Sequence, residues 1–69
     1  MTTKNEVLRC LVVQQKDPTR YKAIIERMRL DGHNWDWQGT LQGVDGTGVT
    51  YNEAVEYGRQ YANGNVVLA

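Results

Sequence analysis

The sequence predicts a small single α+β domain over residues 1–69, in the order strand, helix, strand, short strand, helix, strand. Three observations predict this order: an Asp-Pro pair before an apolar stripe, an alternating stretch with two tryptophans, and a Thr-x-x-Glu sequence before a second stripe. We expect the two helices to lie on one face of a mostly antiparallel sheet, in an arrangement that resembles a compact split βαβ unit.

The first element is a continuous apolar run over residues 7–13. Such a run fits either a buried strand or a helix. Its valines and the break at residues 16–18 favour a strand, whereas residues 3–6 (Thr-Lys-Asn-Glu) have the form of a helix capping box. The strand is the main prediction. The alternative is a helical hairpin over residues 4–30, followed by a β-ribbon and a third helix.

A helix is predicted over residues 17–31. Asp17 can cap the first backbone amides, and Pro18 suits the first helical position, where its missing N–H costs nothing. Gly32 supplies the left-handed stop. Apolar side chains recur at helical spacing at Tyr21, Ile24, Ile25 and Met28. Basic side chains line both flanks of this stripe: Lys16, Arg20 and Arg27 on one, Lys22 and Arg29 on the other.

Residues 34–44 alternate between apolar and polar, which predicts a half-buried strand. The residues expected on its apolar, core-facing side are Trp35, Trp37 and Leu41. Gly39 and Gly43 fall on the same side and suggest a bulge or a close approach there. The Asp-Gly pair at 45–46 predicts a turn, and residues 47–49 can form only a short return strand.

The second helix is predicted to begin after Thr50, because Thr50 and Glu53 have capping-box spacing. Its apolar face consists of Tyr51, Ala54, Val55, Gly58, Tyr61 and Ala62. Gly58 in the middle of that face suggests that a neighbouring backbone approaches closely. The Asn-Gly pair at 63–64 ends the helix, and residues 65–68 read as a terminal strand.

The residue inventory argues against an enzyme. The chain has no serine, one histidine (His33) and one cysteine (Cys10), so no nucleophile–base pair or metal-ligand set is suggested. The Asp-Gly-Thr-Gly sequence at 45–48 lacks the lysine of a phosphate-binding P-loop. We therefore expect no catalytic residue, no cofactor and no metal. A lone buried thiol favours a cytoplasmic protein, and the absence of a long apolar run argues against a membrane partner.

Charge is sorted along the chain. Residues 1–30 hold seven basic and three acidic side chains, a formal +4, whereas residues 31–69 hold one basic and five acidic, a formal −4. Opposed charges speed and orient macromolecular encounters, so this asymmetry predicts a partner-binding surface. The residues expected to form it are Lys16, Arg20, Lys22, Arg27, Arg29, Glu53, Glu56 and Tyr57.

The resulting hypothesis is a small regulatory or inhibitory protein, without enzymatic activity, that binds a protein partner. Its size suggests the class of phage-encoded antagonists of host enzymes or defence systems. The alternative is a nucleic-acid-binding transcriptional regulator that uses the basic helix predicted over residues 17–31. A homodimer is a further expectation, with the basic region of one copy against the acidic region of another around a two-fold axis.

Overall fold

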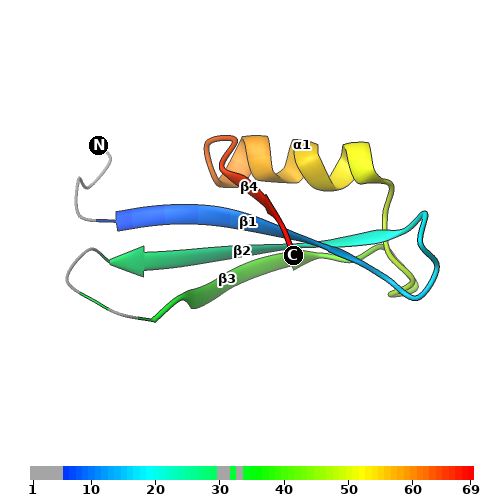
Figure 1. The fold of residues 1–69 in the computed structure, drawn as a ribbon, viewed down its shortest axis with the longest axis horizontal. Helices are drawn as coiled ribbons and strands as arrows, with labels where there is room; N and C mark the ends of the chain where they lie inside the picture. The colour runs from blue at the N-terminus through cyan, green and yellow to red at the C-terminus, as the bar shows by residue number, and fades with distance from the viewer. Residues whose placement is uncertain (1–5, 30–31, 33) are drawn as a thin grey trace.

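Over the residues that the structure describes, the protein is a four-stranded sheet with one helix (Figure 1). A computed structural model of the chain describes residues 6–29, 32 and 34–69. Its elements are β1 (Glu6–Gln14), β2 (Tyr21–Arg29), β3 (Asp36–Leu41), α1 (Tyr51–Tyr61) and β4 (Val66–Leu68). The strand order is β3-β2-β1-β4. Antiparallel pairs join β3 to β2 and β2 to β1, whereas β4 lies parallel to β1, so the sheet is mixed.

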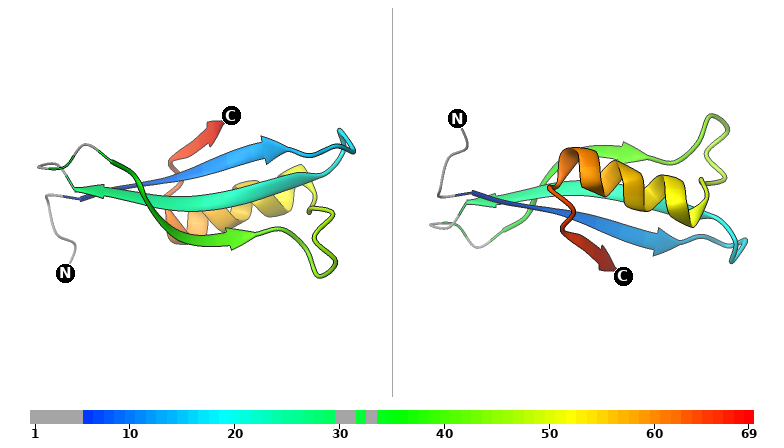
Figure 2. Two further views of the ribbon diagram at one scale, coloured as in Figure 1. Left: turned by 90° about the horizontal axis from the view of Figure 1, so that it is seen from below. Right: turned by 90° about the horizontal axis from the view of Figure 1, so that it is seen from above.

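The helix α1 packs against one face of the sheet, and the opposite face is open. The chain leaves the sheet after β3 at one edge, crosses it as α1, and re-enters it as β4 at the other edge. Figure 2 shows α1 in front of the strands from one side and behind them from the other. Among the elements that the structure describes, none covers the face opposite α1.

The predicted helix over residues 17–31 is wrong, because residues 21–29 form β2, so the two-helix fold class is wrong as well. β2 pairs with β1 without interruption, from Glu6 opposite Arg29 to Gln14 opposite Tyr21. The apolar spacing that suggested a helix arises because β2 is a central strand with apolar side chains on both faces. The predicted helix end at residues 30–31 lies outside the described residues.

The Asp-Pro pair belongs to a hairpin turn rather than to a helix start. The Asp17 carboxylate accepts hydrogen bonds from the Thr19 backbone N–H (3.0 Å) and the Thr19 hydroxyl (2.8 Å). The Arg20 N–H donates to the Asp17 carbonyl at 2.9 Å, and the Gln15 N–H donates to the Arg20 carbonyl at 2.9 Å. Aspartate caps this turn through the same oxygen that would cap a helix, which is why the sequence signal is ambiguous.

Two other local predictions are confirmed, and a third is confirmed only in part. The strand over residues 7–13 is confirmed as β1, so the alternative with an N-terminal helical hairpin is wrong; its expected start at residues 3–5 lies outside the described residues. The capping box of α1 is present: the Glu53 N–H donates to the Thr50 hydroxyl (3.1 Å), and the Thr50 N–H donates to the Glu53 carboxylate (3.0 Å). The expected return strand over residues 47–49 reduces to one bridge between Tyr21 and Val49.

The core between α1 and the sheet is built from small side chains. Its buried members are Cys10, Val12, Ala23, Ile25, Val49, Ala54 and Ala62. Gly58 belongs to the same contact, because a Cβ there would lie 2.7 Å from Val66 Cγ2 and 2.9 Å from Cys10 Cβ. Neighbouring atoms do approach Gly58 closely, but they belong to side chains, so the predicted approach of a neighbouring backbone is wrong. Small residues therefore let the helix lie close against the sheet.

Candidate functional site

A β-bulge in β3 decides where the tryptophans lie. Gly39 is opposite Ile25 and Trp37 is opposite Glu26, so Gln38 is the extra residue between them. Ile25 faces the core, whereas its neighbour Glu26 faces away from it. The bulge thus reverses the alternation, and Trp37 lies on the face opposite α1. The expectation that both tryptophans belong to the core is wrong, although the bulge suggested by Gly39 is confirmed.

We define the open face as the set of side chains on the sheet surface opposite α1. The strand register places aligned residues of neighbouring strands on a common face, and Trp35 joins them through its contact with Arg9. The open face consists of Val7, Arg9, Leu11, Val13, Lys22, Ile24, Glu26, Met28, Trp35, Trp37, Thr40 and Val67. None of these residues is buried in the structure.

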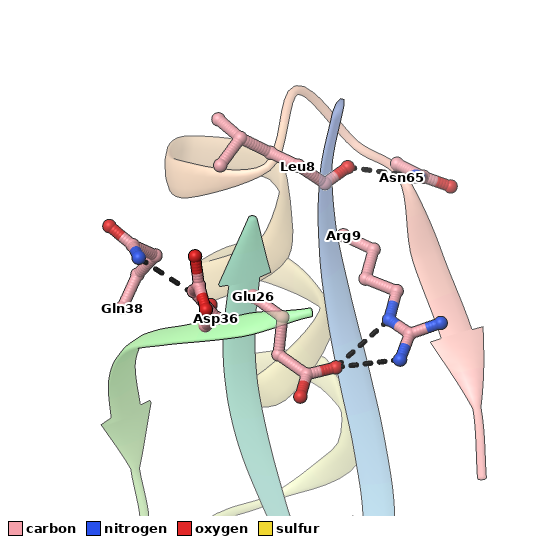
Figure 3. A network of polar contacts seen from close by, with 6 residues as sticks. All are labelled: Leu8, Arg9, Glu26, Asp36, Gln38 and Asn65. Carbon is pink, nitrogen blue, oxygen red and sulfur yellow. Dashed lines mark hydrogen bonds and ion pairs between the residues drawn. The ribbon is translucent and has the colours of Figure 1, made fainter. Parts of the chain in front are cut away.

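The middle of the open face holds one ion pair under an aromatic ring. Arg9 on β1 donates to the Glu26 carboxylate on β2 through Nε (2.9 Å) and lies 2.8 Å from it through Nη2. Figure 3 shows both contacts from the sheet side. The Arg9 guanidinium also stacks on the Trp35 ring, with its carbon 3.8 Å from the ring centre. The two charges satisfy each other, so this part of the surface can meet an apolar partner without leaving an unpaired charge.

Trp37 is the most exposed aromatic residue that the structure describes, with 66% of its surface accessible. Its indole N–H donates to the Thr40 hydroxyl at 2.7 Å, within the same strand. This hydrogen bond fixes the orientation of the ring, and the apolar ring surface stays in contact with solvent. A large ordered aromatic side chain in this state is typical of binding surfaces.

The edges of the sheet are partly closed by the chain's own polar side chains. Beside β4, the Asn65 side-chain amide donates to the Leu8 carbonyl at 2.8 Å (Figure 3), and the Cys10 N–H donates to the Asn65 carbonyl at 2.8 Å. On β3, the Gln38 amide donates to the Trp37 carbonyl at 3.1 Å. These bonds occupy the Leu8 and Trp37 carbonyls, which are therefore less available to a partner strand, so the face is the better candidate for a contact surface.

The basic residues expected at a common surface are distributed over both faces and a turn. Lys22 lies on the open face, whereas Arg27 projects from the other side of β2 and lies 3.5 Å from Glu6. Arg20 donates to the Gly48 carbonyl at 2.6 Å. Lys16 in the turn and Arg29 at the end of β2 are exposed. The charge asymmetry along the chain is therefore partly compensated in the folded protein, because basic residues of β1 and β2 form ion pairs with acidic residues of the same hairpin.

The three other expected contact residues lie on α1. Glu53 is engaged in the capping box, and hydrogen bonds from the backbone and side chain of Thr50 lower the pKa of its carboxylate below 4.5. Glu56 lies 3.7 Å from Arg59, one turn along the helix. Tyr57 is half-buried against the core, and burial, together with Tyr61, raises the pKa of its phenol above 10.0.

A groove of about 470 Å³ lies beside α1 on the covered side of the sheet. It is lined by Leu8, Ile25, Gln38, Gly39, Tyr57 and Tyr61. The tyrosine rings lie 4.9 Å apart between centres. With its raised pKa, the Tyr57 hydroxyl stays protonated at neutral pH, so it can donate a hydrogen bond but supplies no base.

Among the residues that the structure describes, the remaining chemistry-bearing side chains do not gather into a site. Cys10 is fully buried, its thiol lies 3.9 Å from the Ala54 carbonyl, and burial raises the pKa of the thiol. Within the described ranges, no three His, Cys, Asp or Glu side chains lie close enough to hold a metal ion. Over the same part of the chain, no helix has both the length and the apolar character needed to cross a membrane. Comparisons with family models, curated proteins and solved structures give no match for this chain.

Proposed function

We propose that this chain is a protein-binding domain, without enzymatic activity, whose contact surface is the open face. The observation that carries the proposal is the placement of Trp37, two-thirds exposed and held by Thr40, on a sheet surface that α1 does not cover. Apolar patches of several hundred Å² on a folded surface mark interaction sites, and tryptophan is prominent among residues that dominate binding energy.

Charge on the open face favours a protein over a nucleic acid. Among the described residues, the face carries two cations, Arg9 and Lys22, and one anion, Glu26, and Arg9 is already paired with Glu26. A nucleic-acid platform combines stacking aromatics with a groove of unpaired basic side chains. The alternative function, a nucleic-acid-binding regulator, required a basic helix over residues 17–31. Of that range, the structure describes a turn at residues 17–20 and β2 at Tyr21–Arg29.

The proposal retains the regulatory or inhibitory role expected from the sequence and moves the contact surface. The expected surface was charged and included α1, whereas the open face is mainly apolar, with one internal ion pair at its centre. Such a surface gains affinity from desolvation of its aromatic and aliphatic side chains, and its paired charges contribute orientation.

The test compares three immobilised forms of the chain in extract from its native cell: wild type, Trp37→Ala, and Gln60→Ala on the exposed side of α1. We expect a protein that wild type and Gln60→Ala retain and Trp37→Ala loses. Titration of that purified protein should then show a loss of about 2 kcal/mol, roughly thirtyfold in Kd, for Trp37→Ala. Equal binding by all three forms contradicts the proposal, as does a Trp37-dependent shift of a nucleic-acid probe at low salt.

A further inference from the structure

We propose that the protein bound by the open face is a second copy of this chain, related by a two-fold axis with the strands of the two sheets running in opposite directions. The inference rests on the proposed function, because it names a partner for the same surface. It follows from the size of the face and from the order of charges along β2.

The open face has the dimensions of one side of a modest protein interface. β1 and β2 have nine residues each, which at about 3.4 Å per residue gives a length of about 30 Å. Four strands at about 4.8 Å spacing give a width of roughly 15 Å, hence a projected area on the order of 450 Å². Standard interfaces bury about 800 Å² of accessible surface per partner, and side chains add to the projected value, so we expect a weak dimer with Kd on the order of micromolar.

The charges along β2 make the face complementary to itself in one orientation. Lys22, Ile24 and Glu26 are consecutive open-face residues of this strand, with Ile24 midway between opposite charges. A two-fold axis in the plane of the interface, perpendicular to the strands and passing over Ile24, places Ile24 on its own copy. The same axis places Lys22 of each copy over Glu26 of the other.

The alternative two-fold arrangement is unfavourable. An axis parallel to the strands places Lys22 over Lys22 and Glu26 over Glu26, and like charges facing each other cost affinity. In the favoured arrangement, Lys22 approaches a carboxylate that Arg9 already contacts. Packed sheets lie about 10 Å apart, a gap that an extended lysine and a glutamate span from opposite sides. Among the open-face charges, Lys22 thereby gains an ion pair and Glu26 a second cation.

This arrangement also gives the face a central row that is apolar apart from Thr40. Leu11, Ile24 and Thr40 are aligned across β1, β2 and β3, and Val67 lies beside Leu11 on β4. The row lies on the proposed axis and packs against its own copy. The resulting dimer has two sheets inside and one α1 on each outer side, so that both faces of every sheet are covered.

An external partner must compete with the second copy, because one face cannot hold both. Capture of another protein through Trp37 is therefore expected to weaken as the concentration of the chain rises above the dimer Kd.

The test is sedimentation equilibrium of the purified chain from about 1 µM to about 1 mM at 0.15 M salt, a range that brackets a micromolar Kd. We expect the mass to rise from 7.9 kDa to twice that value. Ile24→Glu places two carboxylates on the axis and should weaken the dimer by about a hundredfold or more, and Lys22→Glu by about tenfold. Gln60→Glu on α1 adds the same negative charge as Ile24→Glu, but away from the face, and should leave the mass profile unchanged.

Circular dichroism of each variant establishes folding. If Ile24→Glu does not fold, the dimer Kd of Lys22→Glu, which changes a partly exposed residue, tests the inference instead. A monomer at every concentration overturns the inference, and so does a dimer that neither Ile24→Glu nor Lys22→Glu weakens. If the chain is monomeric but Trp37→Ala still abolishes binding of another protein, only the inference fails. If no association of either kind depends on the open face, the proposed function fails with it.

Discussion

The two faces of the sheet are made by the same strands and differ in what lies on them. On the covered face, Cys10, Val12, Ala23 and Ile25 are at most 4% exposed. On the open face, their sequence neighbours Leu11 and Ile24 are only partly buried, and Trp37 is mostly exposed. The chain thus uses its small side chains to hold α1 and leaves its largest aromatic residues outside the core. Residue size alone is a poor guide to the core, because close approach of a helix requires small residues.

The largest difference between the two faces is expected when the two adjacent isoleucines of β2 are truncated in turn. Ile25→Ala removes a buried side chain from the contact with α1 and should lower the free energy of unfolding by about 3 kcal/mol. Ile24→Ala, at a concentration where the chain is monomeric, should lower it by about 1 kcal/mol or less. Urea denaturation followed by circular dichroism measures both. Equal losses contradict the distinction between a covered and an open face.

The same pair connects stability to association. At concentrations above the dimer Kd, wild type should be stabilised by self-association, and Ile24→Ala should lose that additional stability. Ile25→Ala should retain the concentration dependence, because its side chain lies on the other face.

A smaller effect is expected where α1 begins. Thr50→Ala removes the hydroxyl that accepts the Glu53 N–H and should lower the free energy of unfolding by about 1 kcal/mol.

Glu53→Gln tests the charged half of the capping box. Because the folded-state pKa of Glu53 lies below 4.5, its contribution is present above pH 4.5 and is lost as the pH falls through the folded-state value.

Stability of wild type and Glu53→Gln is therefore expected to differ at pH 7 and to converge towards pH 3. Thermal unfolding at both pH values measures the difference. Asp17 and Asp45 also have lowered pKa values, from hydrogen bonds with Thr19 and Thr47, so both proteins become less stable in acid and only their difference reports on Glu53. A difference that persists unchanged at pH 3 contradicts the assignment.

The sequence predicted local structure correctly where a residue pattern is compatible with one backbone geometry. Thr50 and Glu53 predict α1, since only a helix start brings their side chains and amides together in this way. The signals failed at residues 17–31, because Asp17 caps a turn as readily as a helix and because apolar residues on both sides of β2 imitate a helical stripe. The adjacent β-branched pair Ile24-Ile25 favours a strand and could have corrected the prediction.

The candidate site could be predicted only in part, because it depends on pairing across strands. Gly39 indicated a bulge, but which residue becomes the extra one is fixed by the register with β2, and that register determines where Trp37 points. The expected contact residues were selected by charge along the chain. The hairpin pairs Arg9 with Glu26 and Arg27 with Glu6, so that these basic charges are compensated within the chain. Only Lys22 of that set belongs to the open face.

The smallest effect is expected from the group that orients Trp37. Thr40→Val replaces the hydroxyl that accepts the indole N–H by a methyl group of similar size, so the free energy of unfolding should change by less than about 0.5 kcal/mol. The indole N–H of Trp37 should nevertheless exchange faster with solvent, as measured by NMR. Thr47→Val is the matched control, because it removes a threonine hydroxyl that bonds to Asp45 in a turn.

If the open face binds a second copy, Thr40→Val should also weaken the dimer by a few-fold, because a ring free to rotate loses entropy when it becomes fixed on binding. Unchanged N–H exchange contradicts the hydrogen bond, and faster exchange with an unchanged dimer Kd removes Trp37 from the interface. On the covered face, the buried side chains Cys10, Val12, Ala23 and Ile25 are held by packing, so that loss of order there appears as loss of stability. On the open face, order and stability are separable, and a preorganised ring contributes to affinity without contributing to the fold.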